Sequence, residues 1–456
     1  MTTTSTSRRD SWRPEWARPT VITNFFLGFS GGLPFPLVYA TLSAWLAEAG
    51  LARSTISTLA WIGFAYSFKF IWSPIVDGTR IPLLSRLLGS RRAWLVTAQV
   101  AIGVCLFVMS CLDPATELGV FVGVTVAVAL LSATQDLVID AYRIESDTAE
   151  MQSVLAGAYQ YGYRVALIFS GAGALYLAQW GGWDVAYTVM ALLMSIGLIA
   201  VLLSPEPQRA PKKSHANYLD WLIANVVQPF LEFFKRHGWV TLLILAYVTS
   251  FRISDYVAGV LANPFYLDLG FEKADVATIA KVYGLVVSLI GIAAGSAAVI
   301  RFGVYACLIA SSLLIASTNL TFIFLAYQGP ENWALTITIS ADNFAMGFAG
   351  TVFIAYLSSL INIRFTATQY ALLSSLSAFS GKLIAGFSGR VQEWTGWADW
   401  MAPWMNSAAR DADWAGWVGY FIFAACTGVP SIVLAVLVSL PRFRPTPPPS
   451  ADASPE

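Results

Sequence analysis

The segment VFVGVTVAVALLSATQDLVIDAY, residues 120–142, joins an apolar run to two aspartates four positions apart, Asp136 and Asp140. About twenty apolar residues are enough to cross a bilayer as a helix. An ionised carboxylate in hydrocarbon costs roughly 2.5–3.5 kcal/mol even on the most lenient insertion scale, so such residues normally face a bundle interior or a water-filled path. The segment therefore predicts a membrane-spanning helix of a protein that moves something across the membrane.

The composition of the whole chain also indicates a membrane protein. Hydrophobic residues make up 57% of the 456 residues and charged residues only 12%, far from the usage of soluble domains. The four cysteines stand singly in apolar runs, and neither a disulfide framework nor a metal site is predicted from them. We expect no cofactor and no metal.

Windows of about twenty apolar residues occur twelve times along the chain and predict an all-α, polytopic membrane protein. The expected helices are 21–47, 55–76, 93–112, 118–141, 153–177, 185–203, 239–262, 275–299, 303–325, 333–361, 366–389 and 417–440.

Basic residues are distributed unequally between the two sides of these spans. Eighteen of the 27 lysines and arginines fall on the side that holds both termini, and four fall on the other side. Because basic loops collect in the cytoplasm, we expect both termini to be cytoplasmic.

A polar stretch divides the spans into two sets of six. The expected parts are a tail at 1–20, a six-helix half at 21–203, a cytoplasmic linker at 204–238, a second half at 239–440 and a tail at 441–456. The halves repeat in the same direction, since Gly50 recurs as Gly270 and the pair Ala141-Tyr142 recurs as Ala355-Tyr356. A parallel repeat of six helices resembles the major facilitator fold, in which the substrate site lies at mid-membrane between the halves.

The loop after the second expected span resembles the acidic-then-basic loop of that superfamily. Asp77 stands at a helix end, and Arg91 and Arg92 follow it. We expect these three residues to act as a gate that latches the halves together. A helix cap and an ordinary cytoplasmic basic loop are the alternative.

Four runs are similar to those of the AmpG family of muropeptide permeases. They are GFSGGLPFPL at 28–37, FAYSFKFIWSPIVDG at 64–78, ATQDLVIDAYRIE at 133–145 and FTATQYALLSSLSAFSGK at 365–382. This resemblance implies import of anhydro-muropeptides (GlcNAc-anhydroMurNAc with or without a stem peptide) from periplasm to cytoplasm, across the bacterial inner membrane and at the expense of the proton gradient. A siderophore or another bulky anionic metabolite is the alternative cargo. The partners expected are the cargo, protons and the lipid bilayer, and we expect a monomer.

Three charged residues are candidates for proton coupling. At 1.5 Å per residue, Asp136 lies roughly 9 Å and Lys69 roughly 12 Å inside the cytoplasmic ends of their helices, so they could pair. Protonation of Asp136 would then release Lys69. Asp140 follows one turn later, where a like charge raises one carboxyl pKa. A helix end beside Arg143 is the alternative for Asp140.

Cations inside the spans are candidates for binding an anionic cargo. Arg164 lies roughly 18 Å inside the membrane, and the sequence offers no acidic residue at its depth on the three spans from 118 to 203. A buried guanidinium is stabilised by an anion, so a cargo carboxylate is the expected ligand. Lys382, its counterpart in the repeat, and Arg252 are further candidates. By depth we also expect the pairs Asp255–Lys281 and Asp342–Lys382.

The first span is expected to be broken, because Pro34 and Pro36 lack an amide donor and Gly28, Gly31 and Gly32 lack restraint. Such a break predicts a cavity lining, with close helix packing through Gly28 and Gly32 as the alternative. Polar side chains that could bind a sugar are Tyr39, Tyr66, Gln135, Gln160, Tyr161, Tyr163, Asp342 and Asn343.

Enzyme functions are disfavoured, and no catalytic residue is expected. Residues 28–32 match G-x-S-x-G, but the motif needs a preceding strand and a nearby histidine, and both histidines belong to the linker. No phosphate-binding glycine-lysine loop and no basic face for nucleic acid are present in the sequence. A membrane-embedded transferase remains a distant alternative.

Overall fold

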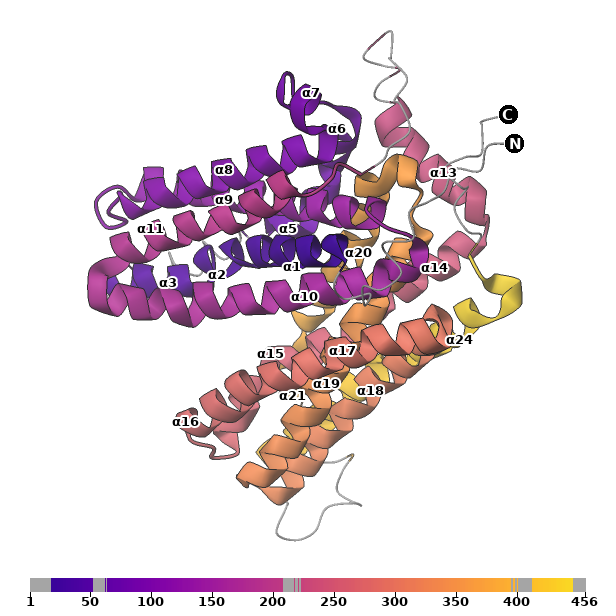
Figure 1. The fold of residues 1–456 in the computed structure, drawn as a ribbon. Helices are drawn as coiled ribbons and strands as arrows, with labels where there is room; N and C mark the ends of the chain where they lie inside the picture. Colours follow the sequence, from indigo (N-terminus) through magenta and orange to yellow (C-terminus); the bar gives the residue numbers. More distant parts are fainter. Residues whose placement is uncertain are drawn as a thin grey trace. The chain divides into compact units, whose positions relative to one another are not determined.

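The computed structural model describes residues 18–51, 62, 64–207, 217, 220, 223–394, 397, 400 and 412–445. Within these ranges all regular structure is helical and no strand occurs, as the all-α prediction requires (Figure 1). Contacts group the chain into two compact units, Met1–Ala65 with Arg80–Gln208, and Tyr66–Thr79 with Arg209–Glu456. The end of the second expected span thus groups with the second unit, while the division into six-helix halves stays a prediction.

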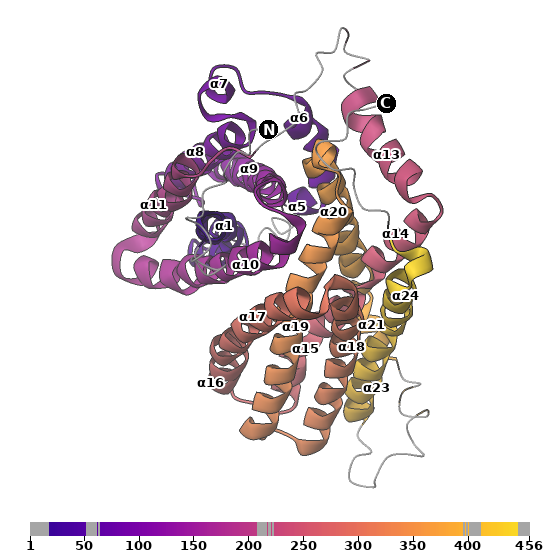
Figure 2. The same cartoon turned by 45° about the vertical axis from the view of Figure 1, so that its right-hand side comes forward.

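The first unit is built around one central helix. In Figure 2, α8, α9, α10 and α11 surround α1, and contacts of α1 with α9, α10 and α11 agree with this view. Its elements, including the start of α5, are α1 Pro19–Gly32, α2 Pro34–Leu37, α3 Ala40–Glu48, α5 Phe64–Phe68, α7 Leu84–Leu88, α8 Ser90–Ser110, α9 Leu118–Glu145, η4 Ala149–Met151, α10 Gln152–Ile168, η5 Phe169–Gly173 and α11 Ala174–Leu203.

The second unit packs α19 against α17 and α18, while α18 also contacts α23 and α24. Its elements are η3 Lys69–Ile71, α6 Ser73–Gly78, η6 Ile223–Val227, α13 Gln228–His237, α14 Val240–Ser250, α15 Ile253–Asp268, α16 Lys273–Val276, η7 Ala277–Tyr283, α17 Gly284–Phe302, α18 Val304–Gln328, α19 Asn332–Leu360, η8 Ile363–Phe365, α20 Thr366–Ala385, α21 Ser388–Gln392, α23 Ala412–Thr427, α24 Val429–Ser439 and η11 Pro441–Phe443.

Nine helical stretches of the described chain are long and apolar enough to cross a membrane. One of them, Gln152–Leu203, has 52 residues and would be roughly 78 Å long if straight, more than twice the hydrocarbon thickness. It turns back at Gly182, whose φ of 87° and ψ of 167° are accessible mainly to glycine. It therefore makes two crossings, as the separate predictions 153–177 and 185–203 require.

Two further predicted spans do not belong to these nine stretches. The span expected at 55–76 lies partly outside the described residues, and its described end forms α5, η3 and α6. The span expected at 366–389 corresponds to α20, whose many serines and threonines make it too polar to be counted. With these two helices, the prediction of twelve spans is consistent with the structure.

The first span is interrupted, as its prolines predict. Leu33 keeps helical dihedral angles, but Pro34 and Pro36 cannot donate to the hydrogen-bond ladder. The chain leaves the helical conformation at Tyr39, with φ −130° and ψ −101°, before α3 begins at Ala40.

The glycines of α1 serve close helix packing rather than a cavity lining. A Cβ atom on Gly28 would overlap the carbonyl oxygen of Tyr159 on α10, and one on Gly32 would lie 2.7 Å from the carbonyl oxygen of Tyr163. From the other side, a Cβ on Gly162 would overlap the carbonyl oxygen of Phe25. Backbone-to-backbone contact of this kind requires small residues at membrane helix interfaces, so the packing alternative describes Gly28 and Gly32 correctly.

We expect Gly28→Ala to destabilise the protein, because the added methyl group forces α1 and α10 apart at their closest contact. Overpacking of this kind costs about 1–3 kcal/mol, which thermal unfolding in detergent would measure as a lower Tm. Gly123→Ala on α9 is the matched control, since nothing lies within 4 Å of the Cβ atom it would add. Equal Tm values for the two variants would contradict this packing.

Candidate functional site

A buried polar cluster joins α1, α8 and α9 in the first unit. Ser30 is fully buried, and its Oγ accepts a hydrogen bond of 2.8 Å from Gln99 Nε2. Gln135 Nε2 also donates to Ser30 Oγ. Gln135, a predicted cargo contact, is fully buried and holds α9 against α1. Its predicted role in cargo binding stays untested.

Asp136 lies next to this cluster, against the bare backbone of α1. A Cβ atom on Gly31 would stand 3.1 Å from Asp136 Oδ1, 3.3 Å from Ile139 Cδ1 and 3.7 Å from Tyr159 Oη. Gly31 therefore leaves the space that a carboxylate needs between α1 and α9. Tyr159, which the sequence reasoning missed, reaches the same point from α10.

Asp140 belongs to a different contact, at the end of α9. It is 8% exposed, and its Oδ1 lies 3.6 Å from Arg143 Nη2. Arg143 is fully buried and donates a hydrogen bond of 3.3 Å from Nη1 to Gln152 Oε1 at the start of α10. The alternative interpretation, a helix end beside Arg143, describes this geometry better than coupling does, although the end is buried and not solvated.

The other predicted cargo contacts of the first unit lie on α10 and at the break of the first span. Gln160, Tyr161 and Arg164 are partly buried neighbours on α10, at positions that adjoin on a helix surface. Tyr163 is also partly buried, with its ring centroid 6.0 Å from that of Tyr159. Tyr39 caps α3, with its ring centroid 4.7 Å from that of Phe35. Tyrosines and an arginine therefore lie together on α10.

In the second unit, Asp255 and Lys382 contact residues that were not their predicted partners. Asp255 pairs with Arg252, and the Nη2–Oδ2 distance is 2.6 Å; the side chain of Lys281, its expected partner, lies outside the described residues. Within the described chain no ion pair joins Asp342 to Lys382, because Lys382 is exposed and donates to Ser67 Oγ at 3.2 Å. Depth along a helix therefore predicted the partner of Lys382 wrongly, while the pair Asp255–Lys281 stays a prediction.

The remaining predicted residues of this unit lie on three elements. Asp342 and Asn343 are partly buried on α19, and Asn343 Nδ2 donates to the carbonyl oxygen of Ile339 at 3.1 Å. Tyr66 lies on α5, and Lys69 begins η3. Because Lys69 and Asp136 belong to different units, their pairing stays a prediction.

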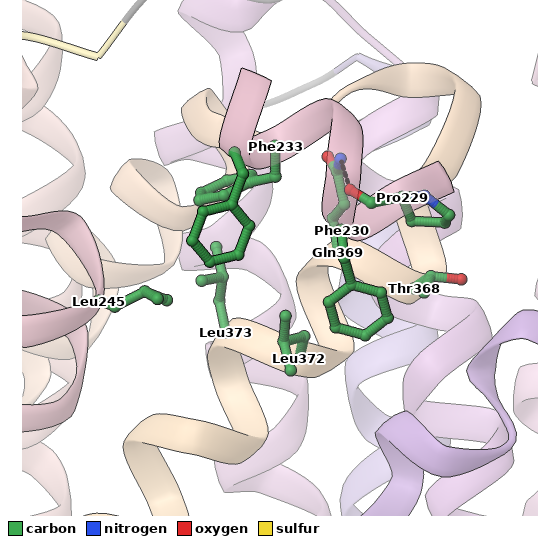
Figure 3. Close-up of a pocket in the computed structure, with 9 residues that line it drawn as sticks. Pro229, Phe230, Phe233, Leu245, Thr368, Gln369, Leu372 and Leu373 are labelled. Carbon is green, nitrogen blue, oxygen red and sulfur yellow. Dashed lines mark hydrogen bonds between the residues drawn. The ribbon is translucent and has the colours of Figure 1, made fainter. Parts of the chain in front are cut away.

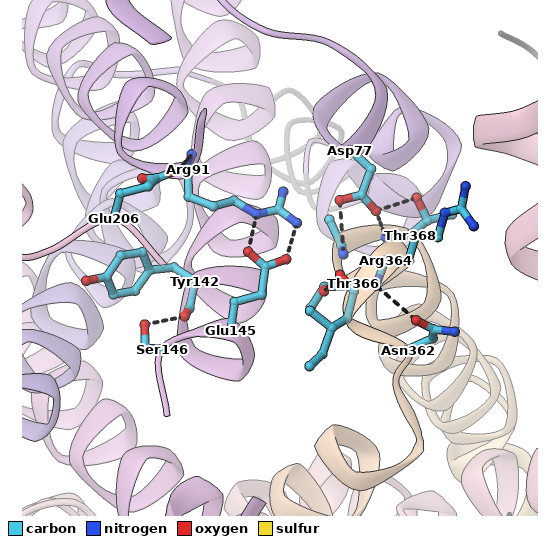
Figure 4. A network of polar contacts seen from close by, with 12 residues as sticks. Asp77, Arg91, Tyr142, Glu145, Ser146, Glu206, Asn362, Arg364, Thr366 and Thr368 are labelled. Carbon is cyan, nitrogen blue, oxygen red and sulfur yellow. Dashed lines mark hydrogen bonds and ion pairs between the residues drawn. The ribbon is translucent and has the colours of Figure 1, made fainter. Parts of the chain in front are cut away.

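Asp77 caps the N-terminus of α20. Its Oδ2 accepts hydrogen bonds of 2.8 Å from both the backbone N–H and the hydroxyl of Thr368, and its Oδ1 accepts one of 3.4 Å from the N–H of Ala367 (Figure 4). The side chain is only 2% exposed. A carboxylate at this position satisfies orphan amide donors and the positive end of the helix dipole. The aspartate of the predicted gate therefore ties α6 to a residue 291 positions away.

Arg91, predicted as part of the gate, is engaged within the first unit. Its fully buried guanidinium forms a two-point ion pair with Glu145, with distances of 3.0 Å for Nε–Oε2 and 2.7 Å for Nη2–Oε1 (Figure 4). Glu206 accepts from the backbone N–H groups of Arg91 and Arg92 and so caps α8. Arg92 donates to the carbonyl oxygens of Val201 and Leu202, at the end of α11. These contacts give both arginines a structural role.

A helix of the expected linker packs against the other side of the same end of α20. On α13, Glu232 accepts from Gln369 Nε2 at 2.6 Å and from Asn362 Nδ2 at 2.9 Å. Arg236 pairs with Glu232 at 2.9 Å and donates to the carbonyl oxygen of Leu360 at 2.8 Å. This network, which the sequence reasoning missed, fixes where α19 ends and α20 begins. The only local signal for it was the apolar and charged pattern of residues 228–237.

A small apolar pocket, with a cavity volume of about 20 Å³, lies between α13, α14 and α20. Phe230, Phe233 and Leu373 point into it, and Gln369 donates to the carbonyl oxygen of Pro229 at its edge (Figure 3). His237 ends the helix with its ring 4.7 Å from that of Phe233. Burial, assisted by the charge of Arg236, lowers the pKa of His237 to about 4, so it stays neutral at physiological pH. A neutral imidazole suits this apolar contact.

Comparisons with known proteins agree with this architecture. Residues 20–385 match the Major Facilitator Superfamily. The chain is 33% identical over 418 residues to the putative transporter AmpG 4 of Rickettsia felis, covering 91% of this chain and 95% of that protein. It is 31% identical over 417 residues to the anhydromuropeptide permease of Escherichia coli K12, covering 90% and 78% respectively.

Solved structures show the same fold. The proton:xylose symporter XylE bound to 6-bromo-6-deoxy-D-glucose superposes with a TM-score of 0.62 at 14% identity, over 92% of this chain and 94% of that one. A human organic anion transporter gives a TM-score of 0.59 at 15% identity, over 93% of this chain and 100% of that one. At such identities the likeness concerns the fold alone. On the family match and the AmpG relatives, the chain belongs to the major facilitator superfamily and, within it, to the AmpG family of multi-pass membrane transporters, and it is not an enzyme.

Proposed function

We propose that this transporter imports anhydro-muropeptides from the periplasm to the cytoplasm, together with protons, as a monomer in the bacterial inner membrane with both termini cytoplasmic. The observation that carries the proposal is the carboxylate of Asp136, placed within a membrane span against Gly31 on the central helix. The name of the Escherichia coli relative supports the cargo. A siderophore or another bulky anion is the alternative cargo on the same scaffold.

Asp136 is the proposed proton carrier. A carboxylate inside a span changes its charge at moderate cost when a polar environment accepts both forms. Tyr159 Oη lies close to the same point of α1, so it can hydrogen-bond either form of the acid. Asp140 is a weaker candidate because it is already engaged in an ion pair with Arg143 at the end of α9.

We expect Asp136→Asn to abolish uptake driven by an inward proton gradient while the protein remains folded. The amide occupies the same space beside Gly31 but cannot carry a proton. Cargo uptake into proteoliposomes, with and without an imposed gradient, would measure this. Asp140→Asn should instead lower the Tm, since it leaves Arg143 with less compensation. Gradient dependence that survives Asp136→Asn and disappears in Asp140→Asn would move the role to Asp140.

Arg164 is the proposed contact for a cargo carboxylate, with Lys382 and Arg252 as further cationic contacts. Guanidinium binds carboxylate through two parallel hydrogen bonds, which gives both affinity and direction. Gln160 and Tyr161 adjoin Arg164 on the surface of α10 and supply hydrogen-bonding and stacking groups for a sugar ring. The lactyl group and stem peptide of the proposed cargo carry such carboxylates.

We expect Arg164→Gln to weaken binding of the carboxylated cargo by roughly ten- to a hundred-fold, because a hydrogen bond to a charged group contributes about 1.5–3 kcal/mol. An amidated analogue should lose much less. Titration calorimetry with both ligands would measure the difference, and Arg86→Gln, at an exposed cytoplasmic arginine, is the control. Equal losses for both ligands would remove Arg164 from the site.

Tight binding of iron chelators in place of muropeptides would favour the alternative cargo.

Asp77 is the proposed gating residue. It holds the N-terminus of α20 from α6, while Glu232 holds the same end from the linker helix. A helix that moves during transport must break and remake such contacts, so their strength sets part of the barrier. Arg91 and Arg92 hold α8 in place in this structure, and their part in the gate stays a prediction.

We expect Asp77→Asn to change the transport rate by roughly two- to thirty-fold, because a charge at a helix N-terminus contributes about 0.3–2 kcal/mol. The dissociation constant of the cargo should change little. Initial uptake rates over a range of cargo concentrations separate the two effects. Thr368→Val removes only the hydroxyl bond to Asp77 and should have a smaller effect in the same direction. An altered affinity at an unchanged maximal rate would contradict the gating role.

A further inference from the structure

The interruption of the seventh expected span carries a charged pair that is only partly covered. α14 ends at Ser250 and α15 begins at Ile253, so Arg252 stands just before the first turn of α15, with φ −102° and ψ 4°. Its Nη2 and Nε lie 2.6 Å and 3.2 Å from the same oxygen, Oδ2 of Asp255. The side chain of Arg252 is 33% exposed and that of Asp255 only 12%. The arginine is therefore more accessible than the aspartate.

The guanidinium of Arg252 packs over the aromatic ring of Tyr256. Arg252 Cζ lies 5.4 Å from the centroid of the Tyr256 ring, one helical turn along α15. The ring of Tyr256 in turn lies against the backbone of α20 at Gly381, where an added Cβ would overlap Cδ2 and stand 2.8 Å from Cε2. Gly381, Tyr256 and Arg252 therefore form a stack. The guanidinium of Arg252 lies over the ring of Tyr256, and the ring fits against α20 because Gly381 has no side chain.

The base of this stack is fixed by buried hydrogen bonds. Ser254, 1% exposed, donates at 2.7 Å to the carbonyl oxygen of Ala424 on α23 and accepts at 2.6 Å from Asn319 Nδ2 on α18. The first turn of α15 is thus held on one side while Arg252 and Tyr256 project from it. A side chain mounted on an immobile turn loses little further freedom when a ligand binds.

The guanidinium keeps donors for a second anion. It has five N–H groups in one plane, and the contacts with Asp255 use one edge of that plane. In the described chain no other acceptor is bonded to this guanidinium, so both N–H groups on Nη1 remain for a ligand. One of these N–H groups and the second N–H of Nη2 are parallel along the other edge of the plane, and the two oxygens of a carboxylate match that pair of donors.

We propose that Asp255, Tyr256 and Gly381 are positioning residues that hold Arg252 as a preformed site for a carboxylate of the cargo. This inference rests on the proposed function. It adds the residues that make Arg252 selective for a cargo that carries a carboxylate. Asp255 aligns the guanidinium, Tyr256 supports its face, and Gly381 leaves room for the tyrosine ring. A neutral analogue of the cargo would leave the Nη1 donors without their acceptor.

The first test removes the alignment without removing the arginine. Asp255→Asn should weaken binding of the carboxylated cargo by roughly tenfold relative to its amidated analogue, because a misaligned guanidinium loses one charge-assisted hydrogen bond. Asp255→Glu, which restores the charge, should recover most of the selectivity. Titration calorimetry on the purified full-length protein with both ligands gives this ratio. A merely structural ion pair would lower the Tm and leave the ratio unchanged.

The second test displaces the ring of Tyr256 by a substitution on α20. Gly381→Ala should displace Tyr256 and reduce the same selectivity, whereas in a Tyr256→Ala background it should change nothing further. Gly259→Ala on α15 is the matched control, since nothing lies within 4 Å of the Cβ atom it would add. An effect of Gly381→Ala that is independent of Tyr256 would overturn the stack.

The outcomes for the wild-type protein separate this inference from the proposed function. A wild-type protein that binds neither ligand overturns the proposed function and the inference together. A wild-type protein that prefers the carboxylated ligand, together with Asp255→Asn and Gly381→Ala variants that retain the full preference, overturns the inference alone.

Discussion

An ionisable side chain inside a membrane protein must be compensated by protein groups or by water, and this constraint shapes both units. The described structure meets it mainly where helices end or break. Arg91 and Glu145 form an ion pair beside the start of α8, and Asp77 accepts hydrogen bonds from amide groups at the N-terminus of α20. Arg252 pairs with Asp255 where α14 gives way to α15. Helix ends supply orphan donors and acceptors, so they are the places where a charge is least costly.

Close helix packing surrounds the carboxylate of Asp136 in the first unit. The contacts of Gly28, Gly32 and Gly162 bring α1 and α10 to backbone distance, and Gly31 faces the carboxylate of Asp136 in the same stretch. Three of these glycines thus allow α1 and α10 to touch, and the fourth, Gly31, leaves room for a charge between α1 and α9. A cavity lining is not needed to explain their presence.

Local features of this fold could be predicted from the sequence, and relations between distant residues could not. The interruption of the first span follows from Pro34 and Pro36, because a missing amide donor acts on its own helix whatever surrounds it. Depth along an axis says nothing about rotation around it, so it did not indicate that Arg252 pairs with Asp255. Arg252 becomes the neighbour only once the chain restarts as a helix at Ile253. Glu232 meets Gln369 across 137 positions, and the apolar and charged pattern of residues 228–237 does not identify that partner.

The internal repeat shows how the two units differ in charge at corresponding places. With Gly50 aligned to Gly270, Gly31 and Gly32 correspond to Phe251 and Arg252. In the first unit this point is bare backbone, and a carboxylate approaches it from α9. In the second unit a guanidinium stands there, aligned by an aspartate of its own helix. A bare backbone beside an acid suits a group that gains and loses a proton, whereas a supported guanidinium suits a permanent positive charge that receives an anion. The same interrupted helix thus accommodates an acid in one unit and a base in the other, and the proposed symport of protons with an anionic cargo requires both.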